Sequence, residues 1–336
     1  MPAWLELTLV VAIALLAIYL RVYRLEQMPP GIFVDETNAA LDAIAIMEGR
    51  HDSPFGTGWF ETPTMYAYYL VGLFKIFGTT FVSLKLASLL PAIITVLLLY
   101  PLARLMFGAP TALAATFLLA VNRWHFNMSR WGWNEVAPPL FQLGATYFLL
   151  RGVRSRQLRD FALGGILLGL GMYTYLASRL VVAVIVAYLL YRIAVERGFL
   201  RKAWAGLIVF WLAYVMTFAP LASTYIRNPF TFLNRSRQVS IFNDVARAGG
   251  SYAPIWENTK RHLLMFQVRG DNNPRHNLPG APMLDPATGI LFVFGLAYSL
   301  WRWHDHRRGL LLLWIPITRL GGILSSLFEG PQGYRV

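Results

Sequence analysis

Long apolar runs separated by short polar segments dominate this chain. Each run approaches the length that an α-helix needs to cross a hydrocarbon core of about 30 Å. The predicted spans are 4–20, 84–103, 110–121, 137–150, 161–177, 180–194, 204–220, 287–301 and 309–327. The pattern predicts an all-α integral membrane protein, a polytopic helical bundle of about nine transmembrane helices that forms a single domain over residues 1–336.

Basic residues cluster in every second loop between these spans. If the N-terminus is cytoplasmic, the cytoplasmic loops hold twelve Lys and Arg residues and the short loops opposite hold three. The twelve are Arg104, Arg151, Arg154, Arg156, Arg159, Arg192, Arg197, Arg201, Lys202, Arg302, Arg307 and Arg308, and the three are Arg123, Arg130 and Arg179. Because loops rich in Lys and Arg stay in the cytoplasm, we expect a multi-pass cell-membrane protein with a cytoplasmic N-terminus. Arg21 and Arg24 follow the first span on the disfavoured side and call for an explanation.

This topology leaves two long segments on the non-cytoplasmic side, about 21–83 and 221–286. Loops of this length usually have a function. In the first, the apolar spacing after Asp35 predicts a short amphipathic helix that Asp35 caps and Gly49 ends. The aromatic and aliphatic stretch 62–77 carries Lys75 near its end, so we expect it to lie in the membrane interface rather than to span.

The composition narrows the class of protein further. Hydrophobic residues make up 56% of the chain and charged residues only 14%, against about 25% charged in soluble domains. The absence of cysteine excludes disulfides, thiolate catalysis and Cys-ligated zinc. The net charge of +13 comes from residues beside apolar runs, where they set topology and meet lipid headgroups, so we expect no nucleic-acid partner. No glycine-rich nucleotide-binding motif is found, which favours a lipid-linked over a nucleotide-linked substrate.

Asp35 and Glu36 form the acidic pair with the clearest catalytic potential. A carboxylate near the membrane surface could act as a general base on an incoming hydroxyl. Adjacent residues at a helix start point in different directions, so Asp35 would face a pocket while Glu36 supports it. The simpler interpretation is that Asp35 is only a helix N-cap and Glu36 a first-turn acid. The spacing alone leaves both open.

The run from Arg21 to Glu36, with Pro29-Pro30-Gly31 before the acidic pair, resembles the first outer loop of the GT-C glycosyltransferases. The group to which it is most similar is family 39, which includes protein O-mannosyltransferases and lipid A aminoarabinose transferases. The stretches 63–78, 84–108, 129–135, 173–179 and 270–285 resemble further parts of this family in the same order. Family members usually continue with more helices and often a periplasmic C-terminal domain. Since this sequence ends at Val336, the resemblance leads us to expect a C-terminally truncated member, whose own activity is open.

The resemblance implies a GT-C-like fold that receives a polyprenyl-phosphate sugar from the bilayer and an acceptor (lipid, protein or glycan) from the outer, periplasmic side. It implies that Asp35, with Glu36 beside it, acts as general base in a direct, inverting displacement. The departing lipid phosphate needs positive charge, from a divalent metal ion or from arginine. Our candidates, in falling order, are Arg130, Arg179 and Arg24, and each could instead be an interfacial arginine that reaches lipid headgroups.

Several outer-loop residues are further candidates for contact with substrate. They are Glu135, Tyr173, Tyr175, Arg275, His276 and Asn277. His276 could complete a metal site with an acidic residue, but one histidine and scattered acids are weak evidence, so no cofactor is assigned. Trp131 and Trp133 could stack on a sugar, although an aromatic belt at the membrane interface is the favoured interpretation.

A secondary transporter or flippase is the main rival class, besides an inactive homologue. Transporters carry charged residues near the middle of the membrane. Here Asp35, Glu36, Glu135 and Asp271 all lie outside the apolar runs and on one predicted face. This placement favours chemistry at the membrane surface over transport.

Overall fold

The computed structural model describes residues 1–50, 53–58 and 61–332. In those ranges helices are the only regular elements apart from two isolated β-bridges. The α-helices are α1 (Ala3–Val22), α2 (Val34–Met47), α3 (Met65–Phe77), α4 (Phe81–Phe107), α5 (Ala109–Val121), α6 (Arg123–Met128), α7 (Pro138–Ser155), α8 (Leu158–Gly171), α9 (Ser178–Val195), α10 (Phe199–Arg227), α11 (Pro229–Gln238), α12 (Ile241–Arg247), α13 (Ala253–Leu264), α14 (Pro286–Trp301) and α15 (His306–Ile323). Two short 3₁₀ helices are η2 (Asn134–Val136) and η3 (Leu327–Glu329).

Each predicted span coincides with a helix, in order α1, α4, α5, α7, α8, α9, α10, α14 and α15. By length and composition, four of these, α1, α4, α9 and α10, could each cross a membrane. The helices α3, α5 and α14 are apolar but shorter. The all-α membrane class is therefore confirmed, and the number of nine transmembrane helices stays a prediction.

The two largest differences between predicted and observed boundaries lie at the C-terminal ends of α8 and α10. The span expected over 161–177 ends at Gly171, because the backbone then forms tight turns in which Tyr173 N donates to Leu170 O (3.0 Å) and Thr174 N to Gly171 O (3.1 Å). The span expected over 204–220 continues to Arg227 through Pro220. The turn after α8 brings Tyr173 and Tyr175 out of the predicted helix.

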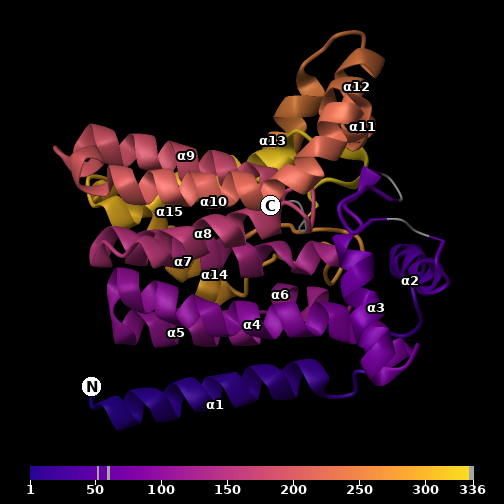
Figure 1. The fold of residues 1–336 in the computed structure, drawn as a ribbon, viewed down its shortest axis with the longest axis horizontal. Helices are drawn as coiled ribbons and strands as arrows, with labels where there is room; N and C mark the ends of the chain where they lie inside the picture. Colours follow the sequence, from indigo (N-terminus) through magenta and orange to yellow (C-terminus); the bar gives the residue numbers. More distant parts are fainter. Residues whose placement is uncertain (51–52, 59–60, 333–336) are drawn as a thin grey trace. The chain divides into compact units, whose positions relative to one another are not determined.

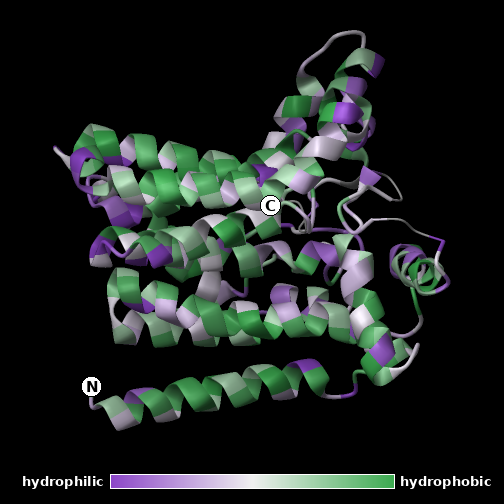
Figure 2. Ribbon diagram, in the orientation of Figure 1, coloured by the Kyte–Doolittle hydropathy of each residue, from purple (hydrophilic) through white to green (hydrophobic). Residues whose placement is uncertain are grey.

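The described residues pack as two compact units. The first comprises Met1–Val121, His125–Ser178 and Ala203–Thr231, and the second comprises Asn122–Trp124, Arg179–Lys202 and the chain from Phe232 on. Within the first unit, α1, α4, α5, α7 and α8 run beside one another (Figure 1). Hydrophobic residues cover α1 along most of its length, as Figure 2 shows. Ala17, Val96 and Ala120 are fully buried where α1, α4 and α5 meet.

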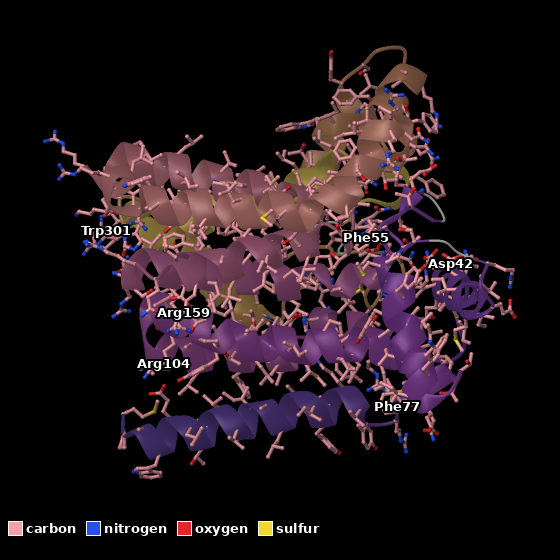
Figure 3. All side chains as sticks on the ribbon, in the orientation of Figure 1. Asp42, Phe55, Phe77, Arg104, Arg159 and Trp301 are labelled. Atoms are coloured by element: carbon pink, nitrogen blue, oxygen red, sulfur yellow. The ribbon has the colours of Figure 1, made fainter. Side chains whose placement is uncertain are left out.

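In the first unit, basic loops that are predicted to be cytoplasmic lie at the opposite end of the helices from the first predicted outer segment. Figure 3 places Arg104 and Arg159 at one end of these helices, and Asp42, Phe55 and Phe77 at the other. The predicted cytoplasmic loops of this unit, 104–109 and 151–160, thus share one end, and the first outer segment lies at the opposite end. Which end faces the cytoplasm stays a prediction.

A hydrophobic cluster attaches α2 and α3 to the start of α4. Ala43 of α2, Leu70 and Phe74 of α3, and Leu84 and Ala87 of α4 are all buried in it. The cluster holds α2 in a fixed orientation, and with it the acidic pair in its first turn.

Glycines allow α8 and α10 to approach closely. A Cβ at Gly165 would lie 2.1 Å from the backbone oxygen of Phe210, and one at Gly169 would lie 2.7 Å from Thr217 Cβ. Small residues commonly permit such contacts between membrane helices. This contact brings α10 beside the turn that carries Tyr173.

In the second unit, Asn258 of α13 holds the end of α15. Its buried side-chain amide donates to the carbonyls of Gly322 (3.1 Å), Ile323 (2.9 Å) and Ser325 (2.8 Å). Gly322 and Ile323 lie in the last turn of α15 and Ser325 just after it, so this amide links α13 to the C-terminal end of α15. Asp285 caps α14, as an N-cap aspartate should, by accepting from Thr288 N at 3.0 Å.

We expect Gly165→Ala to destabilise the protein by about 1–3 kcal/mol, because the added methyl group forces the backbones of α8 and α10 apart. The measurement is the midpoint of thermal unfolding in detergent. The matched control is Gly295→Ala on α14, where an added Cβ meets no atom within 4 Å. An equal midpoint for both variants would contradict the close contact.

Candidate active site

The acidic pair lies in the first turn of α2, but Asp35 is not the N-cap. The helix begins at Val34, and Phe33 is the N-cap residue with extended backbone angles. Glu36 Oε2 accepts the Phe33 N–H at 2.9 Å. A glutamate three residues after the N-cap is typical of helix starts, and this bond starts the helix two residues earlier than predicted. The N-cap interpretation of Asp35 is therefore wrong, and Asp35 is a half-buried residue inside the helix.

Glu36 connects the first outer loop with the second. Its side chain is fully buried, and Oε1 accepts the backbone N–H of Gly132 at 2.7 Å. Gly132 cannot be replaced easily, because a Cβ there would lie 2.8 Å from Leu84 Cγ. Burial raises the pKa of Glu36, while the two N–H donors and the nearby charge of Lys85 act in the opposite direction. Glu36 thus ties the start of α2 to the second outer loop, and its supporting role in catalysis stays a prediction.

Lys85 is a site residue that the sequence analysis missed. It lies in the first turns of α4 and is fully buried. Its Nζ donates to Pro29 O (2.8 Å) and Leu25 O (3.4 Å), and it attracts the Glu36 carboxylate. A lysine inside an apolar run is costly and usually functional, so its place within the predicted span 84–103 was the available signal.

Arg130 donates hydrogen bonds to the end of α1 and to the segment that follows it. Its Nε and Nη2 donate to Met28 O (3.1 and 2.9 Å), and Nη1 donates to Leu20 O (3.1 Å) and Arg21 O (3.0 Å). The side chain is almost entirely buried, which lowers its pKa. Four hydrogen bonds use most of the five N–H groups of a guanidinium. Its predicted contact with a donor phosphate stays a prediction, whereas its role in fixing residues 20–28 is direct.

The second outer loop is packed around tryptophans. The rings of Trp131 and Trp133 stack with centroids 5.7 Å apart, and Phe33 meets Trp131 edge-on at 4.7 Å. Ser88 accepts from Trp133 N (2.7 Å) and donates to Trp133 O (2.6 Å). Both indoles are at least 96% buried, so the interpretation as a lipid-facing aromatic belt is wrong for this pair.

The other predicted residues of the first unit lie around these loops. Arg24 is exposed, with a left-handed φ of 52° and its guanidinium 5.6 Å from the Tyr23 ring centroid. Glu135 is half-buried in η2. Tyr173 is buried, donates to Thr217 O (2.9 Å) and accepts from Leu221 N (3.3 Å), which ties its turn to α10. Tyr175 in the same turn is half-buried.

The remaining predicted residues belong to the second unit. Arg179 donates to Phe232 O at 2.7 Å and covers the Phe232 ring at 3.8 Å. His276 Nδ1 lies 2.7 Å from Asp271 Oδ2, and both side chains are buried. Asn277 accepts from Arg123 at 3.2 Å and donates to Ala281 O at 2.6 Å. Arg275 N and Nε both donate to Asn273 Oδ1.

A resident metal ion is not supported by the geometry. Across the described ranges no group of three or more His, Asp or Glu side chains is placed to hold one. His276 is oriented by Asp271 within its own loop.

Comparison with known proteins identifies the fold. Residues 61–222 match the family model described as dolichyl-phosphate-mannose-protein mannosyltransferase. No curated protein matches the chain in sequence. The oligosaccharyltransferase of Archaeoglobus fulgidus, solved with zinc and sulfate, superposes with a TM-score of 0.62 at 18% identity over 93% of this chain and 45% of its own. ArnT from Cupriavidus metallidurans bound to undecaprenyl phosphate gives 0.61 at 16% identity over 99% and 58%. The chain thus spans about half the length of these two structures.

We expect Lys85 and Glu36 to depend on each other energetically at pH 7. In a double-mutant cycle of Lys85→Met and Glu36→Gln, the double variant should lose less stability than the sum of the singles by about 0.5–3 kcal/mol, because each single change leaves a buried charge without its partner. Thermal unfolding in detergent measures the cycle. Lys75→Met, an exposed lysine on α3, should add to Glu36→Gln without coupling. Strict additivity for Lys85 would contradict the interaction.

The raised pKa of Glu36 also predicts the pH dependence of stability. Its folded pKa lies above the unfolded value of about 4.3, so the folded chain binds this proton more tightly. The contribution of the group is full below the unfolded pKa and is lost as the pH rises through the folded pKa. The unfolding free energy of the wild type relative to Glu36→Gln should therefore fall with rising pH in this window. Paired unfolding curves test this, and a relative stability that rises with pH would contradict it.

Proposed function

We propose that this chain, which has the GT-C fold of membrane glycosyltransferases, transfers a sugar from a polyprenyl-phosphate donor to an acceptor hydroxyl at the non-cytoplasmic surface. The match of residues 61–222 to a mannosyltransferase family supports the reaction type. ArnT, which has the same fold, was solved with undecaprenyl phosphate. A polyprenyl phosphate reaches the enzyme through the bilayer, which suits the apolar helices of this chain.

The observation that carries the proposal is the buried Glu36 carboxylate, which joins the two outer loops beside Asp35. Its bonds to Phe33 N and Gly132 N fix the first turn of α2. Asp35 therefore occupies a rigid backbone position, half-buried and at a helix N-terminus. Such a carboxylate is held in place and only partly buried, which suits a general base.

In the proposed reaction Asp35 accepts the proton of the acceptor hydroxyl as its oxygen attacks the anomeric carbon of the donor. The bond between that carbon and the phosphate oxygen breaks, and its electron pair leaves with the lipid phosphate. A single displacement inverts the anomeric configuration. The acceptor can be a lipid, a protein or a glycan.

Positive charge must stabilise the departing phosphate. Of the three candidate arginines, Arg24 is the exposed one, whereas Arg130 is committed to four backbone carbonyls. Arg179 keeps a guanidinium packed on Phe232. The geometry therefore favours Arg24 over Arg130 for contact with phosphate and reverses the order that the sequence suggested. Glu135, Tyr175 and Arg275 remain candidates for contact with the sugar or the acceptor.

We expect Asp35→Asn to lower sugar transfer by about 10²–10⁴-fold, because it removes the base and keeps the shape. The measurement is transfer of radiolabelled sugar from polyprenyl-phosphate donors in proteoliposomes that contain the full chain, with several acceptors. The control is Glu48→Gln, which neutralises an exposed acid at the other end of α2.

Each outcome of this assay has a definite meaning. Transfer that collapses only in Asp35→Asn supports the base. Equal transfer by wild type and Asp35→Asn would exclude Asp35 from that role. No transfer by well-folded wild type would favour the alternative of an inactive homologue.

A further inference from the structure

The second unit contains a cavity of about 260 Å³ whose lining includes Lys260, Arg261 and Arg269. One face of α13 lines it with Glu257, Lys260, Arg261 and Leu264. These positions are three or four residues apart, so they share one side of the helix. Arg269 and Asn272 form a second wall, and Gly330 with Pro331 a third. No residue of the candidate active site lines this cavity.

The charges in the cavity do not cancel. Glu257, the acid of the lining, is paired with Arg261 through a 2.9 Å bond from Nε to Oε1. Lys260 and Arg269 are exposed, and neither side chain has a hydrogen-bond or ion-pair partner among the side chains that the structure describes. Two cations at the cavity are therefore without an ion-pair partner in that part of the chain.

Arg261 is held in an orientation that suits an anion. Its Nε is bound to Glu257, and Nη1 points to Leu327 O (3.5 Å) and Gly330 O (3.3 Å). These bonds leave the Nη2 edge of the guanidinium for a ligand. A fixed guanidinium beside a lysine is a typical arrangement for binding phosphate oxygens.

The exposed residues around α13 favour a position of this helix at a membrane surface. Tyr252 and Trp256 are 70% and 74% exposed, and Leu263 is 52% exposed. Exposed aromatic and aliphatic residues beside Lys and Arg are typical of helices that lie in the membrane interface. The cavity is smaller than the roughly 300–1,000 Å³ of drug-sized sites, which suits a compact charged headgroup better than an acyl chain.

We propose that this cavity is a binding site for a phosphate group, presented by an anionic lipid headgroup or by a soluble phosphorylated molecule. Lys260, Arg269 and the Nη2 edge of Arg261 contact the phosphate oxygens, and the Asn272 amide adds a neutral donor. Leu264 provides an apolar contact for the part of the headgroup next to the phosphate. The site is separate from the proposed transfer reaction and does not depend on it.

The test uses the full chain in nanodiscs of zwitterionic phosphatidylcholine. In one arm, inorganic phosphate is titrated and binding is measured by calorimetry. In the other, phosphatidylglycerol is added to the bilayer and retained lipid is counted by native mass spectrometry. Saturable binding in the first arm identifies a site for soluble phosphate, and selective retention in the second identifies a site for a lipid headgroup.

The informative variant is Lys260→Gln with Arg269→Gln, which leaves Arg261 and its structural bonds intact. We expect it to weaken phosphate or phosphatidylglycerol binding by at least about tenfold, since it removes two charge-assisted contacts. The matched control is Arg237→Gln with Arg247→Gln, which removes two exposed cations from the neighbouring helices α11 and α12.

Two results would overturn the site. Equal weakening by both double variants would mean that only net charge matters. Wild-type protein that binds neither probe in a saturable way would exclude a phosphate site. Unchanged unfolding midpoints show that neither double variant acts through misfolding, as expected for exposed side chains.

Discussion

A carboxylate removed from water needs hydrogen-bond donors, and Glu36 accepts from two backbone N–H groups, one nearby in the sequence and one far away. One belongs to Phe33 in its own helix start and the other to Gly132 in the second outer loop. The same carboxylate therefore begins α2, joins two loops and sets the position of Asp35. Because an unsatisfied buried charge is far more costly than an ordinary lost contact, this arrangement holds the proposed site more firmly than apolar packing alone would.

Two cationic side chains hold the backbone from the end of α1 to the start of α2. Carbonyls at the C-terminus of a helix and in the loop after it lack regular helix bonds and can take donors from elsewhere. Lys85 supplies Leu25 and Pro29, and Arg130 supplies Leu20, Arg21 and Met28. Two buried cations thus hold this stretch of backbone in place, and one of them also attracts Glu36.

Arg21 has a structural explanation for its place on the disfavoured side of the first span. It is fully buried and donates to Ala17 O (3.1 Å) and Ala120 O (2.9 Å), and its Nη2 lies 2.8 Å from His125 Nδ1. Burial, aided by the charge of Arg21, lowers the pKa of His125 to about 3. The imidazole is therefore neutral near pH 7, and its Nδ1 can accept a bond from the guanidinium. Arg21 thus joins α1 to α5 and to the second outer loop, while Arg24 remains exposed to solvent.

The sequence predicts local features of this protein better than tertiary ones. Apolar runs identify the helices because length and hydrophobicity are local, and the order of motifs leads to the GT-C fold. The position of the N-cap was wrong because Glu36 at the third helical residue, and not Asp35, satisfies the first backbone N–H. The burial of Trp131 and Trp133 and the role of Lys85 were missed, since each depends on a partner about 45 to 100 positions away along the chain. Even so, a lysine within an apolar run could have been recognised, because a membrane helix keeps such a charge only where another part of the protein pairs with it.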